Sequence, residues 1–84
     1  MIQIHYFASI REQLETDQEQ INLPDCVSNI DELINYLQSI NPKFDAAVNA
    51  NNKILVALNQ TVVDRSHELS ENDEVAFFPP MTGG

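Results

Sequence analysis

Hydrophobic and polar residues alternate at the start of the chain. Within residues 2–8 (IQIHYFA), Ile2, Ile4 and Tyr6 fall in one phase, whereas Phe7 falls in the other. A period of two is typical of a strand that buries one of its faces. We therefore expect a first strand at residues 2–8, with Phe7 turned away from the core.

The middle of the chain changes to helical spacing. Ser28 or Asn29 can cap the N-terminus of a helix, and Asp31 or Glu32 lies three residues further on, where it can complete a capping box. Asn41-Pro42 is expected to end the helix, because the residue before a proline avoids helical geometry. Five aliphatic residues recur every three or four positions and predict one buried face: Ile30, Leu33, Ile34, Leu37 and Ile40.

Three shorter segments flank this helix. Residues 9–20 (SIREQLETDQEQ) predict a helical turn followed by a polar loop. Residues 20–24 (QINLP) predict a short second strand, which Pro24 stops because proline cannot donate to a sheet ladder. Residues 43–50 are compatible with another short turn of helix.

The second half of the chain predicts a hairpin and a final strand. Residues 53–63 (KILVALNQTVV) indicate strand, turn and strand, because Asn59-Gln60 separates two apolar runs and asparagine tolerates left-handed geometry. A polar stretch follows, with Leu69 as its single expected core anchor. Residues 74–78 (EVAFF) predict the last strand, which Pro79-Pro80 closes off.

This order of elements predicts an α+β fold. A hairpin, one crossover helix and a returning terminal strand make a mixed five-stranded sheet with one main helix packed on one face. The ubiquitin-like β-grasp is the commonest small fold of this kind. We expect residues 1–78 to form this domain and residues 79–84 to form an extended C-terminal tail.

Two phenylalanines fall in the outward phase of strands that a β-grasp places side by side as parallel neighbours. Phe7 is out of phase with Tyr6, and Phe78 is out of phase with Val75 and Phe77. We expect the two rings to meet beside the root of the tail and to form a patch that binds a partner. The alternative is that both rings tuck under loops as peripheral core.

Charge narrows the range of partners. Thirteen acidic residues against four basic ones give a net charge of −9. Nucleic acids and anionic membranes need the opposite sign, so we expect neither as a partner. A basic protein partner suits this charge, although solubility alone also accounts for it. Neither a signal peptide nor an apolar run long enough to span a membrane is evident, so a cytoplasmic location is expected.

The side chains predict little chemistry of their own. No Cys/His cluster suggests a metal site, the single Cys26 has no disulfide partner, and no glycine-rich loop is available to cradle phosphate. The two glycines of the chain are Gly83 and Gly84. They follow two prolines that favour an extended backbone, and glycine lets a chain end thread a narrow channel. The tail therefore indicates an arm that carries one functional group, its terminal carboxylate.

Three stretches resemble a known family, the sulfur-carrying small subunits of molybdopterin synthases. They are YFASIREQLETD near the N-terminus, NQTVVD in the hairpin and DEVAFFPPMTGG at the end. The resemblance covers the whole chain in order and length. One departure is the loop before the last strand, where the family often has a glycine and this chain has residues 71–73, Glu-Asn-Asp. Asparagine can take the same turn geometry.

The resemblance implies a cycle centred on Gly84. An ATP-dependent adenylating enzyme activates the Gly84 carboxylate, and a sulfur donor, either a cysteine desulfurase or a rhodanese-like protein, converts the adenylate to a thiocarboxylate. The tail then enters the large, catalytic subunit of the synthase and delivers sulfur to cyclic pyranopterin monophosphate. This chain is then a sulfur-donating but non-catalytic subunit that binds no permanent cofactor. The residues that thread are Pro79, Pro80, Met81, Thr82 and Gly83.

The family's hydrophobic docking surface falls by position on Phe7, Val62 and Phe78. Two other functions share the Gly-Gly ending and stay open. One is the sulfur carrier of the thiamine pathway, which forms the same thiocarboxylate. The other is a ubiquitin-like modifier that is conjugated to target lysines through Gly84.

Overall fold

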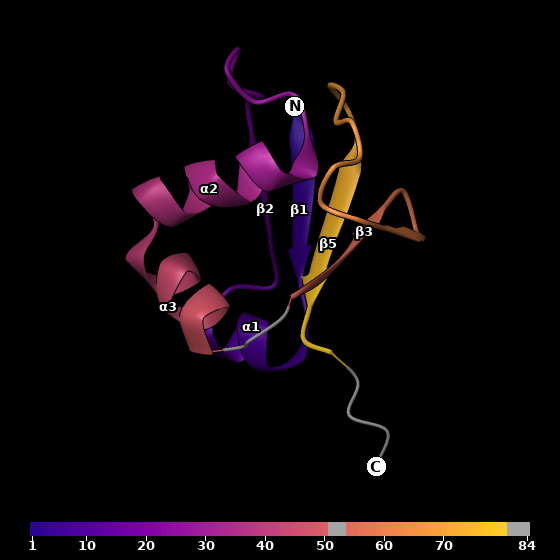
Figure 1. Ribbon diagram of the computed structural model, residues 1–84. Coiled ribbons are helices and arrows are strands. Elements are labelled where there is room, and N and C mark those ends of the chain that lie inside the picture. The colour runs from indigo at the N-terminus through magenta and orange to yellow at the C-terminus, as the bar shows by residue number, and fades with distance from the viewer. Residues whose placement is uncertain (51–53, 81–84) are drawn as a thin grey trace.

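The computed structural model describes residues 1–50 and 54–80. Its centre is a five-stranded sheet with the strand order β2-β1-β5-β3-β4 (Figure 1). Strands β1 and β5 run parallel, and each other neighbouring pair is antiparallel. The last strand therefore lies in the middle of the sheet, beside the first. The strands are β1 (Ile2–Tyr6), β2 (Gln18–Ile21), β3 (Leu55–Leu58), β4 (Thr61–Val63) and β5 (Glu74–Phe78).

Three helices accompany the sheet in the described residues: α1 (Ala8–Leu14), α2 (Ile30–Ile40) and α3 (Pro42–Ala50). Helices α2 and α3 lie on one side of the sheet, and α1 packs against α3 near the end of β1 (Figure 1). The inward side chains of β1 and β5 meet these helices in one core. The mixed five-stranded sheet with its main helix on one face is the arrangement that the sequence predicts. None of the helices in the described ranges is long and apolar enough to cross a membrane.

An aromatic cluster forms the centre of this core. Tyr6, Phe44 and Phe77 are almost completely buried, and their ring centroids lie 5.3 to 6.3 Å apart. The Tyr6 hydroxyl donates a 2.7 Å hydrogen bond to Glu19 Oε1 on the neighbouring strand. Burial raises the pKa of Tyr6 far above its ordinary value, and the hydrogen bond and the charge of Glu19 add to the effect. The phenol therefore stays neutral and holds β2 to β1.

Helix α2 begins with the predicted capping box. The side chain of Asn29 accepts a hydrogen bond from the Glu32 amide, at 2.8 Å. The Glu32 carboxylate accepts in turn from the amide and the hydroxyl of Ser28, at 2.8 and 2.7 Å. The bond to Asn29 satisfies an amide that the first turn of a helix leaves without a partner, and the bonds from Ser28 hold the residue before the cap. After α2, Asn41 accepts from the amides of Lys43 and Phe44 and so caps α3.

The structure corrects four of the predicted segments. The first strand ends at Tyr6 instead of residue 8, because Ala8 takes a left-handed φ of 53° and starts α1. The predicted helical turn is a seven-residue helix that buries Ile10 and Leu14. The second strand covers Gln18–Ile21 instead of residues 20–24. Helix α3 is nine residues long where a short turn was expected, so two further helices accompany the predicted main helix α2 in the described residues.

The hairpin between β3 and β4 is confirmed. Asn59 and Gln60 have φ values of 50° and 72°, as a two-residue turn with both central residues left-handed requires. Leu69 is buried as expected and is held by a backbone hydrogen bond from its amide to the Ser28 carbonyl.

Candidate functional site

The sheet has one face that the helices leave uncovered, which we call the open face. The strand register places on it the residues that alternate with the buried ones. Its end nearest the start of β5 is rich in amides, and its end nearest Pro79 is apolar. The open-face residues are Gln18, Gln20, Gln3, His5, Glu74, Ala76, Phe78, Ala57, Leu55 and Val62.

The apolar end contains a shallow hollow of about 360 Å³, which we call the apolar hollow. Ala57 and Ala76 face each other across β3 and β5, and their short side chains let the surface dip between larger neighbours. The hollow adjoins Phe78, where β5 ends and Pro79 and the exposed Pro80 continue the chain. It is lined by His5, Phe7, Ala57, Gln60, Glu74, Ala76 and Phe78.

The structure brings two of the three predicted docking residues to this hollow. Phe7 is 48% exposed and Phe78 is half-buried, and both line it. Val62 is 64% exposed on the edge strand β4, opposite Ala57 in register, so it lies beside the hollow without lining it. The outward phase predicted for the two phenylalanines is therefore confirmed. Their role in docking stays a prediction.

The two rings were expected to meet; both line the apolar hollow, and a direct contact between them stays a prediction. The ring of Phe7 stacks on His5, with centroids 6.5 Å apart and an interplanar angle of 24°. The backbone of Phe7 fixes this position, because its amide donates to the Phe77 carbonyl and its own carbonyl accepts from the amides of Ile10 and Arg11. Phe7, which lies between β1 and α1, and Phe78, the last residue of β5, thus both line the hollow.

Sequence reasoning missed His5 and Glu74 as members of this surface. The side chain of His5 is only 26% exposed. Its Nε2 lies 3.4 Å from Glu74 Oε2, close enough for an ion pair if the ring is protonated. The contact lacks hydrogen-bond geometry, and Nε2 is buried with no hydrogen-bond partner. The outward phase of both residues was the available signal, but their proximity depends on the register of β1 against β5.

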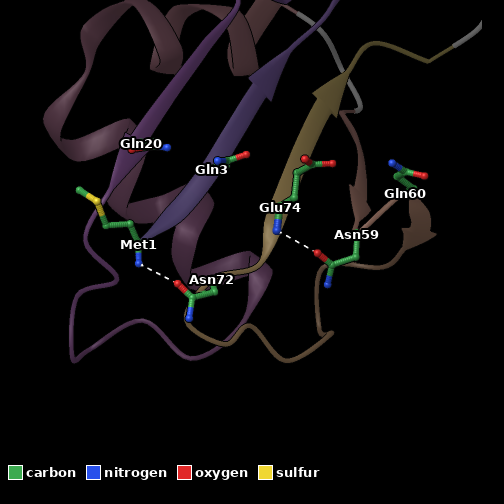
Figure 2. Close-up of a pocket in the computed structure, with 7 residues that line it drawn as sticks. All are labelled: Met1, Gln3, Gln20, Asn59, Gln60, Asn72 and Glu74. Carbon is green, nitrogen blue, oxygen red and sulfur yellow. Dashed lines mark hydrogen bonds between the residues drawn. The ribbon is translucent and has the colours of Figure 1, made fainter.

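The other end of the open face holds a second, more polar hollow, which we call the polar hollow (Figure 2). Asn59 holds the start of β5, since its side chain accepts from the Glu74 amide at 3.0 Å and its amide donates to the Glu74 carbonyl at 2.8 Å. The N-terminal amine donates to Asn72 at 3.3 Å. The residues that line this hollow are Met1, Gln3, Gln20, Asn59, Gln60, Asn72 and Glu74.

The remaining predicted site residues are Met81, Thr82, Gly83 and Gly84, which lie outside the described residues. In the described ranges, no group of three His, Cys, Asp or Glu side chains is arranged to hold a metal ion. Cys26 is an exposed free thiol in the loop before α2.

The fold and this surface define a class, a ubiquitin-like β-grasp protein whose open face is apolar beside the root of its C-terminal segment. Residues 4–84 match the ThiS family, and the chain belongs to that family. The molybdopterin synthase sulfur carrier subunit of Escherichia coli K12 is 36% identical over 84 residues, and that of Haemophilus influenzae is 34% identical, each alignment covering 100% of both chains. The resemblance drawn from the three sequence stretches is confirmed.

Solved structures share the fold. Small archaeal modifier protein 1 from Haloferax volcanii superposes with a TM-score of 0.78 at 20% identity, covering 99% of this chain and 98% of that one. A complex of subunits 1 and 2 of the molybdopterin-converting factor from Helicobacter pylori contains a chain that superposes with a TM-score of 0.67 at 19% identity, covering 99% and 97%. At these identities the two structures support the β-grasp fold alone.

Proposed function

We propose that this chain is the sulfur carrier subunit of a molybdopterin synthase and that Gly84 carries the sulfur as a terminal thiocarboxylate. The observation that carries the proposal is the 36% identity to the Escherichia coli sulfur carrier subunit over the whole of both chains. The position of the apolar hollow supports it, because the hollow lies where β5 ends and the tail of residues 79–84 begins.

The proposed chemistry takes place at the main-chain terminus. An ATP-dependent adenylating enzyme joins the Gly84 carboxylate to AMP and releases pyrophosphate, which turns a poor acyl group into a reactive one. The persulfide of a cysteine desulfurase or rhodanese-like donor then attacks the acyl carbon and displaces AMP, and a thiol reduces the resulting acyl disulfide to the thiocarboxylate. Transfer of this sulfur to cyclic pyranopterin monophosphate, with water supplying the replacement oxygen, restores the carboxylate. No side chain of this protein has to act as an acid or a base, so its role is that of a non-catalytic subunit.

The tail is suited to delivery. Pro79 and Pro80 favour an extended backbone and cannot join the sheet ladder. Six residues from Pro79 to Gly84 reach roughly 20 Å at about 3.3 Å each. Met81 and Thr82 continue the arm, and Gly83 lacks a Cβ atom that would obstruct a narrow channel.

The proposed partner is the large, catalytic subunit, which docks on Phe7, Val62 and Phe78. Two of these side chains are about half exposed or more, and the third is half-buried beside the apolar hollow. Interfaces are commonly held by a few such apolar anchors that fill pockets. The Helicobacter pylori relative of this fold is solved in complex with its subunit 2. A net charge of −9 suits a partner with a basic surface around its pocket.

Intact-mass spectrometry of the protein recovered from cells tests this function. We expect a species heavier by the exchange of one oxygen for sulfur, and we expect that species to convert cyclic pyranopterin monophosphate when the large subunit is added. Deletion of Gly84 should abolish both results and leave the fold intact, and addition of one residue after Gly84 provides a second length variant.

The alternatives give other outcomes. Covalent adducts to other proteins would indicate a ubiquitin-like modifier. A thiocarboxylate that the large subunit cannot use would indicate the carrier of the thiamine pathway. Normal pterin sulfuration by the Gly84 deletion would contradict the proposal.

A further inference from the structure

The two hollows of the open face meet at Glu74. Glu74 and Gln60 line both of them. Among the strand positions that the register places on the open face, Glu74 is the one carboxylate, and none is a lysine or an arginine. Two cations of the described residues already have partners elsewhere, since Lys43 pairs with Glu15 and Arg65 with Asp31. The negative charge of Glu74 therefore lacks a lysine or arginine partner on its own face.

The position of Glu74 is fixed by its surroundings. Asn59 binds both its amide and its carbonyl, and Gln3 lies opposite it in the parallel ladder. Figure 2 shows its side chain rising from β5 beside Gln3 and Asn59. The side chain is 41% exposed, and His5 Nε2 lies 3.4 Å from its Oε2 without hydrogen-bond geometry. The backbone of Glu74 is thus fixed, and its carboxylate lies at the rim of the apolar hollow with capacity to accept hydrogen bonds.

Docking over the apolar hollow would cover this carboxylate. A charge that loses water on binding costs free energy unless the partner supplies an opposite charge and hydrogen-bond donors. A partner that binds the apolar hollow tightly therefore needs a group that satisfies Glu74. The overall charge of −9 also favours a positively charged partner surface.

We propose that Glu74 is the charge-recognition residue of the docking surface, and that a lysine or arginine of the synthase large subunit binds its carboxylate when the apolar hollow is occupied. This inference rests on the proposed function. It adds a polar specificity element to the apolar residues Phe7, Val62 and Phe78, because a partner with an apolar or acidic group at this position would leave Glu74 buried without compensation.

The test compares Glu74→Gln with Glu71→Gln, which removes one exposed carboxylate three residues away and outside both hollows. Binding of the full-length chain to the large subunit from the same organism is measured from about 0.01 M to about 1 M salt, over which the Debye length falls from about 30 to about 3 Å. We expect Glu74→Gln to weaken binding roughly tenfold at low salt, equivalent to about 1.4 kcal/mol. The difference should shrink as salt rises, and Glu71→Gln should stay close to the wild type throughout.

The variant His5→Gln distinguishes pairing of Glu74 with a cation of the partner from pairing of Glu74 with His5 inside this protein. If the partner supplies the cation, His5→Gln changes affinity by the same factor at every salt concentration. If it lowers the salt dependence as much as Glu74→Gln does, His5 provides the charge and the inference is wrong. Equal behaviour of Glu74→Gln and Glu71→Gln also overturns it and leaves the proposed function intact. Failure of the wild-type chain to bind the large subunit would overturn both.

Discussion

Two adjacent phenylalanines at the end of β5 allow a test of which side chains stabilise the fold and which contribute to the proposed docking. Phe77 is completely buried against Tyr6 and Phe44, whereas Phe78 points to the open face and lines the apolar hollow. Phe7 lines the same hollow and is 48% exposed. We predict that Phe7→Ala and Phe78→Ala weaken docking more than folding, and that Phe77→Ala does the reverse.

The magnitudes follow from burial. Full burial of a phenylalanine side chain is worth about 1.5–3 kcal/mol, so half-burial of Phe7 corresponds to about 1 kcal/mol, and its removal leaves no internal cavity. Removal of the buried Phe77 ring is expected to cost about 3–5 kcal/mol. That is a large part of the roughly 4–13 kcal/mol expected for a chain of 84 residues. In an interface, loss of an aromatic anchor costs about 2 kcal/mol or more, which is roughly thirtyfold in Kd.

The assay is urea unfolding followed by circular dichroism, together with a binding titration against the large subunit. Phe7→Ala and Phe78→Ala should unfold near the wild-type midpoint and bind weakly, and Phe77→Ala serves as the core control in the unfolding measurement. The reasoning would be refuted if Phe7→Ala lost as much stability as Phe77→Ala while its Kd stayed unchanged.

Two further predictions concern stability. Gln60→Gly should raise the free energy of unfolding by about 0.5 kcal/mol. Gln60 has a left-handed φ of 72°, which costs a non-glycine residue about 1–2 kcal/mol, whereas the extra backbone entropy of glycine costs about 0.5–1 kcal/mol. A lower urea midpoint for the variant would contradict this prediction. The Ser28 hydroxyl and then the Ser28 amide hold the pKa of Glu32 below its ordinary value of 4.5. A carboxylate whose pKa is lower in the folded state stabilises the fold at pH above its unfolded pKa, and this stabilisation is lost as pH falls through its folded pKa. Below pH 4.5 the wild type should therefore lose stability faster than Glu32→Gln in an acid titration followed by circular dichroism. Parallel curves for the two proteins would refute this prediction.

The regular elements could be predicted because local patterns specify them. Alternation defined β1, the aliphatic repeat and the capping residues defined α2, and Asn59-Gln60 defined the hairpin. The sequence predicted only a helical turn where α1 forms. The start of α1 depends on Ala8, and alanine gives no local sign of a left-handed φ. That conformation is held by packing of the helix that follows it, through Ile10 and Leu14.

The candidate surface was predicted only where phase along a single strand was sufficient. The alternation in residues 2–8 correctly predicted that Phe7 is exposed. The alternation in β5 correctly predicted that Phe77 faces the core and Phe78 faces away from it. The apolar hollow depends on residues from three strands that are distant in sequence. Ala57 faces Ala76 only because β3 pairs with β5 in one register. Phase alone cannot supply this pairing, since it does not fix the offset between strands.

The register of β5 links the core to the docking surface. Side chains alternate between the two faces of a strand, so a slip of one residue would exchange the faces of Phe77 and Phe78. Val75 and Phe77 are both fully buried, which makes such a slip costly and fixes Phe78 on the open face. The same register sets the residue at which the chain leaves the sheet, because Pro79 follows Phe78 and cannot extend the ladder. The inward residues of β5 therefore orient the proposed docking surface and the residue at which the chain leaves the sheet. On the proposed function, substitutions of the outward residues should change partner affinity while the core stays intact.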